Sequence, residues 1–196
     1  MTAMPQDKVS QSFLLARALA VSAYVSVERA QAGLFAHLSG ATEDKAGIIF
    51  FKITSARSRR EILEKLKRKK HSQLHNLYWN SLIKFIGELD NRRNAIIHWM
   101  IKTDMNIDLP PAAQITKLSL IPPSWWIGDD DPPEIEEKDL QEFVAKCGFA
   151  ERSVNVFHWS ISGHPHVDAA WQDIFQQPLA YPPPYTHPLA PKQPAP

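Results

Sequence analysis

All but one of the 16 prolines lie in two stretches of the chain, and this distribution decides where long helices can form. Six of them, in three adjacent pairs, fall within residues 102–134, and nine fall between Pro165 and Pro196. Proline has no N–H to donate and disfavours helical geometry in the residue before it, so a proline pair ends a helix. Long helices are therefore expected only before residue 102 and between the two stretches.

Helical spacing of apolar residues predicts four long helices, at about residues 9–38, 43–69, 74–101 and 136–162. Ser39 and Gly40 close the first, and Thr42 is the expected N-cap of the second. Residues 99–107 and 115–121 are predicted to pair as two strands within the proline-containing segment. From residue 164 onward the chain is predicted to be a disordered tail with polyproline character, after a short helical segment at 168–176.

These elements predict an all-α fold, a bundle of four to five helices with a small irregular or β excursion at residues 102–135. Residues 1–162 form the expected helical domain, and residues 163–196 form the proline-rich tail. The composition, 44% hydrophobic and 22% charged with a net charge of +1, is ordinary for one domain with a tail.

The single cysteine, Cys147, excludes an intramolecular disulfide, and no Cys/His ladder indicates zinc. We therefore expect no metal, no cofactor and a cytoplasmic location. The apolar run from Phe13 to Val27 contains Arg17 and follows Lys8 and Asp7, so neither a signal peptide nor a membrane span is predicted.

The second half of the second predicted helix is strongly basic. Between Arg57 and Lys70 there are eight Lys or Arg residues against Glu61 and Glu64. Two interpretations stay open: a solvated helix end whose cations suit the helix dipole, or a surface that binds the phosphates of a nucleic acid. The candidate nucleic-acid-binding residues are Arg57, Arg59, Arg60, Lys65, Lys67, Arg68, Lys69 and Lys70.

Arg93 stands in the middle of an apolar stripe of the third predicted helix. At about 100° per residue, the stripe residues lie within roughly 40° of it. A guanidinium cannot lose its proton and is costly to bury without an acceptor, so it needs an ion pair inside the monomer or a cleft for an arriving anion. Asn94 and His98, four residues apart, flank it on the same helix. The stripe comprises Leu82, Ile86, Leu89, Ile97 and Met100.

The run Arg93-Asn94-Ala95-Ile96-Ile97-His98, late in the third of four helices and after a basic second helix, resembles the motif of the HEPN superfamily (higher eukaryotes and prokaryotes nucleotide-binding). The resemblance covers about residues 10–162. It implies a metal-independent endoribonuclease that acts as a toxin or defence factor and dimerises so that two motifs share one cleft, with the apolar face around Arg93 as dimer surface.

Carried over to this chain, the resemblance implies a role for each motif residue. Arg93 would bind and neutralise the scissile phosphate, His98 would move protons, and Asn94 would orient the pair. The 2′-hydroxyl of the RNA would be the nucleophile, and the product would be a 2′,3′-cyclic phosphate. A group that titrates near neutral pH suits proton transfer, and a fixed cation suits the charge that develops on the phosphorane.

Three alternatives remain open on sequence grounds. Arg92 lies at a neighbouring spacing from His98 and could replace Arg93 in the motif. The chain could instead be a non-catalytic HEPN-like module that binds nucleic acid or protein. The expected partners are RNA and a second copy of the chain, and an antitoxin or regulatory protein is a further candidate. In one HEPN branch, a partner nucleotidyltransferase modifies a tyrosine at the position where this chain has Met100. The methionine therefore argues against an antitoxin of the nucleotidyltransferase type. In a purely structural role, Arg93 would pair with Glu88, Asp90, Asp139 or Glu142.

Overall fold

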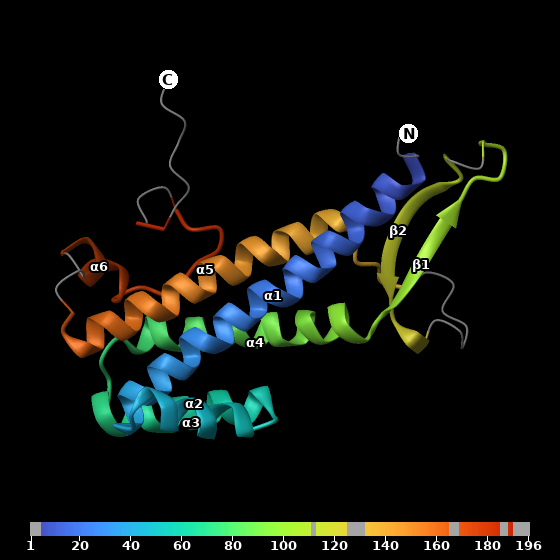
Figure 1. The fold of residues 1–196 in the computed structure, drawn as a ribbon. Coiled ribbons are helices and arrows are strands. Elements are labelled where there is room, and N and C mark those ends of the chain that lie inside the picture. The colour runs from blue at the N-terminus through green and yellow to red at the C-terminus, as the bar shows by residue number, and fades with distance from the viewer. Residues whose placement is uncertain (1–4, 111–112, 125–131, 165–168, 185–187, 190–196) are drawn as a thin grey trace. The chain divides into compact units, whose positions relative to one another are not determined.

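The structure is a computed structural model that describes residues 5–110, 113–124, 132–164, 169–184 and 188–189. This part of the chain is mostly helical with one small antiparallel sheet, as the sequence predicts (Figure 1). Among the described residues, no helix combines the length and apolar character needed to cross a membrane. The elements are α1 (Pro5–Ser39), α2 (Glu43–Lys52), α3 (Ala56–His71), α4 (Asn76–His98), β1 (Met100–Met105), β2 (Ile115–Ile121), α5 (Glu137–Ser162) and α6 (Ala169–Ile174).

The chain divides into two compact units, which we describe separately. The first comprises Met1–Val25 and Asn91–Ala145, and the second comprises Ser26–Asp90 and Lys146–Pro196. The motif residues Arg93, Asn94 and His98 therefore belong to the first unit, whereas the whole basic segment from Arg57 to Lys70 belongs to the second.

The first unit contains the predicted pair of strands. β1 and β2 are antiparallel, with Met100 opposite Ile121, and they form the hairpin drawn in yellow-green in Figure 1. Glu134, just before α5, accepts hydrogen bonds from Lys102 of β1 at 2.5 Å and from Lys117 of β2 at 2.7 Å. These two bonds lower the pKa of Glu134 to about 2. The carboxylate thus ties both strands to the chain that enters α5.

The second predicted helix is in fact two helices, so the continuous helix expected at 43–69 is wrong. α2 ends at Lys52 and α3 begins at Ala56. The Ser55 hydroxyl accepts a hydrogen bond from the backbone N–H of Ser58 at 3.2 Å, which is an N-cap that satisfies a free donor of the first turn. The apolar run of the first half extends to Ile53, beyond the end of α2, and for that reason the periodicity did not reveal the break.

The prediction of a disordered tail after residue 176 is wrong for the described residues up to Tyr181, and the chain that leads into them is also packed. Phe175, which follows α6, is fully buried in the second unit, and its ring centroid lies 4.9 Å from those of His75 and Tyr78. Burial of a phenylalanine side chain stabilises by roughly 1.5–3 kcal/mol. This stabilisation accounts for the packing of a segment flanked by prolines.

The chain beyond Phe175 makes further contacts in the second unit. The ring of Tyr181 lies 5.7 Å from Phe85 and 5.4 Å from Phe149 between centroids, and the backbone N–H of Leu179 donates to the Ser81 hydroxyl at 2.6 Å. Proline fixes φ but does not prevent extended chain from packing. Over these residues, the chain that was expected to be a disordered tail is therefore a packed part of the second unit.

Cys147 lies on α5 and is fully buried in the second unit. Burial in an apolar environment disfavours the thiolate and raises the pKa of this thiol to about 12. The side chain thus acts as a small apolar core residue.

Candidate functional site

Arg93 is half-buried and lies against an aromatic ring of its own unit. Its guanidinium carbon is 5.7 Å from the ring centroid of Tyr24 on α1, a cation–π contact. Tyr24 is itself buried and stacks on Phe143 of α5 at 6.5 Å. One side of the Arg93 guanidinium is therefore packed against a buried aromatic ring.

The other two motif residues are exposed. Asn94 follows Arg93 on α4, and its Oδ1 accepts a hydrogen bond from the Arg93 Nη1 at 3.1 Å. His98 is the last residue of α4, one turn beyond Asn94. The structure thus joins Arg93 to Asn94 directly and presents the imidazole of His98 to solvent near the end of the same helix.

Most of the apolar stripe on which Arg93 stands is covered by the chain itself. Leu82, Ile86 and Leu89 are all at most 3% exposed. The expectation that the apolar face around Arg93 is dimer surface is therefore wrong for these three residues. Only Ile97 and Met100, at the far end of the stripe, keep partial exposure.

Arg92, the alternative motif arginine, faces an acid. Its Nη2 lies 3.8 Å from the Asp139 carboxylate at the start of α5, and about a third of its side chain is exposed. In the second unit, Asp90 forms an ion pair with Arg60 of α3. Two of the four acids considered as partners of Arg93 thus pair with other arginines.

Arg17, on α1, caps the end of the helix that carries the motif. Its Nε donates to the Ile96 carbonyl at 3.0 Å, and its Nη2 donates to the carbonyls of Ile97 at 3.1 Å and Trp99 at 3.4 Å. The last carbonyls of a helix have no partner within the helix and carry partial negative charge. This role was not predicted from the sequence; the available signal was a cation within the apolar run of α1.

Replacing Arg17 by methionine should destabilise the protein by about 2 kcal/mol, because several part-buried hydrogen bonds to a charged donor are lost. The amides of the last turn of α4 should also exchange hydrogen faster. Chemical denaturation and hydrogen exchange measure the two effects. Arg29→Met, at an exposed position of the same helix, is the control and should change stability by less than about 0.5 kcal/mol. Equal effects of the two substitutions would contradict the capping role.

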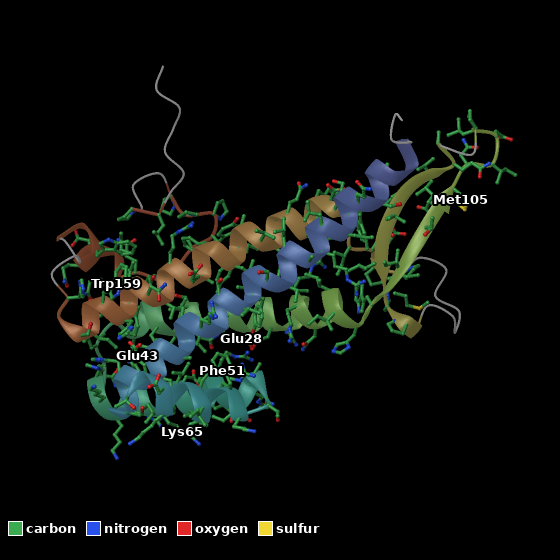
Figure 2. All side chains as sticks on the ribbon, in the orientation of Figure 1. Glu28, Glu43, Phe51, Lys65, Met105 and Trp159 are labelled. Atoms are coloured by element: carbon green, nitrogen blue, oxygen red, sulfur yellow. The ribbon has the colours of Figure 1, made fainter. Side chains whose placement is uncertain are left out.

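The basic segment is only partly a surface, which corrects the list of candidate nucleic-acid-binding residues. Arg59, Arg60 and Lys67 are largely or fully buried. Arg57 pairs with Glu61, and Lys70 donates to the carbonyl of His37. The exposed cations of α3 are Arg57, Lys65, Arg68, Lys69 and Lys70, of which Lys65 is labelled on the surface of α3 in Figure 2.

Arg59 stabilises the junction of α2 and α3. Its guanidinium donates to the carbonyl of Ile53, the C-cap of α2, at 2.7 Å and pairs with Glu28 of α1 at 2.5 Å. It also lies over the rings of Phe50 and Phe51. These contacts occupy the side chain, so Arg59 does not belong to a phosphate-binding surface.

Three histidines of the second unit lie close together, with His37 stacked on His71 and tilted against His158. The ring centroid of His37 lies 6.0 Å from that of His71 and 5.2 Å from that of His158. Burial lowers the pKa of all three below the ordinary value of 6.5, and the charge of Lys70 contributes in the same direction. Within the described ranges, no group of three His, Cys, Asp or Glu residues is arranged to hold a metal ion.

The free energy of unfolding should fall as the pH falls from 7 to 5. The pKa values of His37, His71 and His158 are lower in the folded state than in the unfolded state, so below about pH 6.5 the unfolded chain binds protons that the folded chain does not. Stability is therefore full above pH 6.5 and declines towards the folded-state pKa values. Urea titrations at several pH values measure the slope, and His71→Gln should make it shallower. A flat profile between pH 7 and 5 would contradict the lowered pKa values of this half-buried cluster.

Compared with protein-family models, with curated proteins and with solved structures, the chain matches none. The fold and the contacts above thus define a helical protein with a small antiparallel hairpin.

Proposed function

We propose that this chain is a metal-independent endoribonuclease of HEPN type. The observation that carries the proposal is the end of α4: Arg93 is held against Tyr24 and hydrogen-bonded to Asn94, and His98 is exposed one turn further along. A fixed cation beside an amide and an accessible imidazole is the set that phosphodiester transfer to a neighbouring hydroxyl requires.

In the proposed reaction, the 2′-oxygen of a ribose attacks the adjacent phosphorus and the bond from phosphorus to the 5′-oxygen breaks. One His98 imidazole accepts the proton of the 2′-hydroxyl, and a second, protonated imidazole donates a proton to the leaving 5′-oxygen. Arg93 stabilises the charge on the phosphorane oxygens, and Asn94 orients the guanidinium. The products are a 2′,3′-cyclic phosphate and a 5′-hydroxyl.

Each chain has one His98, so the proposal includes a homodimer that supplies both imidazoles. Large apolar side chains on the surface of α1 support self-association. Leu15 is 61% exposed and Leu19 is 51% exposed, and both line a shallow groove of about 230 Å³ together with Val144 of α5. Exposed apolar patches of this kind commonly mark protein interfaces.

A second candidate is a non-catalytic HEPN-like module that binds nucleic acid. It is favoured by the exposed cations of α3, which include Lys65, Arg68 and Lys69. Lys and Arg side chains on one surface supply the sequence-independent part of nucleic-acid affinity. In the ribonuclease proposal, the exposed cations of α3 contribute to RNA binding.

The ribonuclease proposal also includes a regulator or antitoxin that restrains the activity in the cell.

Incubation of the purified protein with single-stranded RNA in EDTA tests the proposed reaction. The expected result is cleavage to fragments that end in a 2′,3′-cyclic phosphate, identified by mass spectrometry. A preparation of the His98→Ala variant controls for contaminating nuclease. RNA that is bound but stays intact would reject the enzyme and favour the binding module.

A further inference from the structure

A cavity of about 350 Å³ lies in the second unit, where α3 passes into α4. This volume is within the range of small-molecule sites. Polar and charged side chains supply most of the wall, with Trp79 as the aromatic member. The wall includes the cations Lys65, Lys67 and Arg68, the acids Glu61 and Glu64, and the polar residues Ser72 and Asn76.

Lys67 is the unusual member of this wall. It is 1% exposed, and its Nζ donates to the Ser72 carbonyl at 3.2 Å and to the Asn76 Oδ1. Both acceptors are neutral, and burial lowers the pKa of the ammonium group. An ammonium removed from water is costly unless an opposite charge compensates it. An anion bound in the cavity would supply that charge.

The turn that closes the cavity is held in a conformation that side chains rarely adopt. Ser72 has φ of +43° and His75 has φ of +53°, and neither is glycine. Such a conformation is strained for a residue other than glycine and persists where the surrounding structure holds it. At Ser72 this conformation accompanies the hydrogen bond from Lys67, so the turn fixes the position of the ammonium group.

We propose that this cavity binds a phosphoryl group, with Lys67 as the buried counter-charge and Lys65 and Arg68 as further cations on its wall. The three cations of the wall outnumber its two acids, so the wall favours an anion, and its several N–H donors match the several oxygens of a phosphoryl group better than the two oxygens of a carboxylate. Lysine binds phosphate as a point charge, and the amide of Asn76 can donate to a second oxygen. A phosphate monoester of a small molecule and the phosphodiester of RNA both carry this group. The site is separate from the Arg93 motif and does not rest on the ribonuclease proposal.

NMR titration of the full chain with inorganic phosphate tests the proposal. Burial lowers the pKa values of His71 and His75, and the charge of Lys67 lowers them further, so a bound phosphate that offsets this charge should raise both pKa values towards 6.5. Lys67→Met should weaken phosphate binding at least tenfold. Lys84→Met, an exposed position of α4 outside the cavity, is the matched control and should leave binding unchanged.

Asn76→Asp keeps the test decisive if Lys67→Met fails to fold. The new carboxylate would pair with the Lys67 ammonium, so the protein should stay folded but lose phosphate binding. Acetate should bind at least tenfold more weakly than phosphate. If a short oligoribonucleotide displaces the bound phosphate, the natural ligand is the phosphodiester of RNA. If ribose 5-phosphate displaces it and the oligoribonucleotide does not, the natural ligand is the phosphate monoester of a small molecule. Unchanged histidine resonances at saturating phosphate, equal effects of the two lysine variants, or binding retained in Asn76→Asp would each overturn the proposal.

Discussion

Replacing Arg60 by alanine is expected to destabilise the protein by about 3–5 kcal/mol, because it removes the cation that faces the buried Asp90 carboxylate. The Arg60 side chain is 17% exposed and that of Asp90 is 6% exposed, so water cannot replace the lost partner. The guanidinium also packs 3.6 Å from the position that a Cβ would occupy at Gly87 of α4. Chemical denaturation followed by circular dichroism measures the loss.

The same helix offers a control for this prediction. Arg57 pairs with Glu61 at 2.8 Å, but its side chain is 83% exposed, so Arg57→Ala should cost about 0.5 kcal/mol or less. The double variant Arg60→Met with Asp90→Leu should recover much of the stability, since apolar residues often replace a buried ion pair without loss. Similar losses in Arg60→Ala and Arg57→Ala would show that the buried pair contributes no more than a surface pair.

Replacing His98 by alanine should lower the rate of RNA cleavage by about 10²–10⁴-fold, the usual contribution of a general acid or base. Arg93→Ala should lower it by about 10²-fold or more, because the phosphorane loses its cation. Single-turnover cleavage of a labelled single-stranded RNA measures both rates. Stability should change little: His98 is exposed, and Arg93 loses a cation–π contact worth about 0.5–1 kcal/mol.

Arg92→Ala is the matched control, since Arg92 is the neighbouring arginine and faces Asp139. It should leave the cleavage rate close to that of the wild type. If Arg92→Ala abolishes cleavage and Arg93→Ala does not, the motif arginine is misassigned. If Arg93→Ala unfolds the protein, the arginine has a structural role and the enzyme proposal loses its main support.

The helices and the hairpin could be predicted because their signals are local. Apolar spacing placed α1, α4 and α5, and proline pairs with a β-branched run placed the strands. The break at residues 53–55 could not be predicted in this way, because Ile53 continues the apolar pattern and the carbonyl end is capped by Arg59, six residues further along. The packing of Phe175 was missed for a similar reason, since a lone aromatic residue near prolines has no periodicity.

The candidate site was predictable in its motif but not in its surroundings. Arg93 and Asn94 are adjacent in sequence. In contrast, Tyr24 contacts Arg93, and Arg17 caps the end of α4, from a segment some 70 to 80 residues away in the sequence. The inward cations of α3 did leave a signal: Arg60 and Lys67 lie three and four residues from the buried Leu63, on one face of the helix. The number of charged residues between Arg57 and Lys70 does not show which of them lie on the buried face of α3.

The burial of Cys147 gives this protein a built-in reporter. It is the only sulfhydryl of the chain, so an alkylating reagent has one target and its product needs no mapping. Because only the ionised sulfur reacts, and because the folded protein suppresses that form, modification requires α5 to separate from its neighbours, and with a reagent that reacts faster than the segment closes it should proceed at the rate of that opening. Labelling kinetics of the untouched wild-type chain should therefore time local opening of the second unit without any engineered probe.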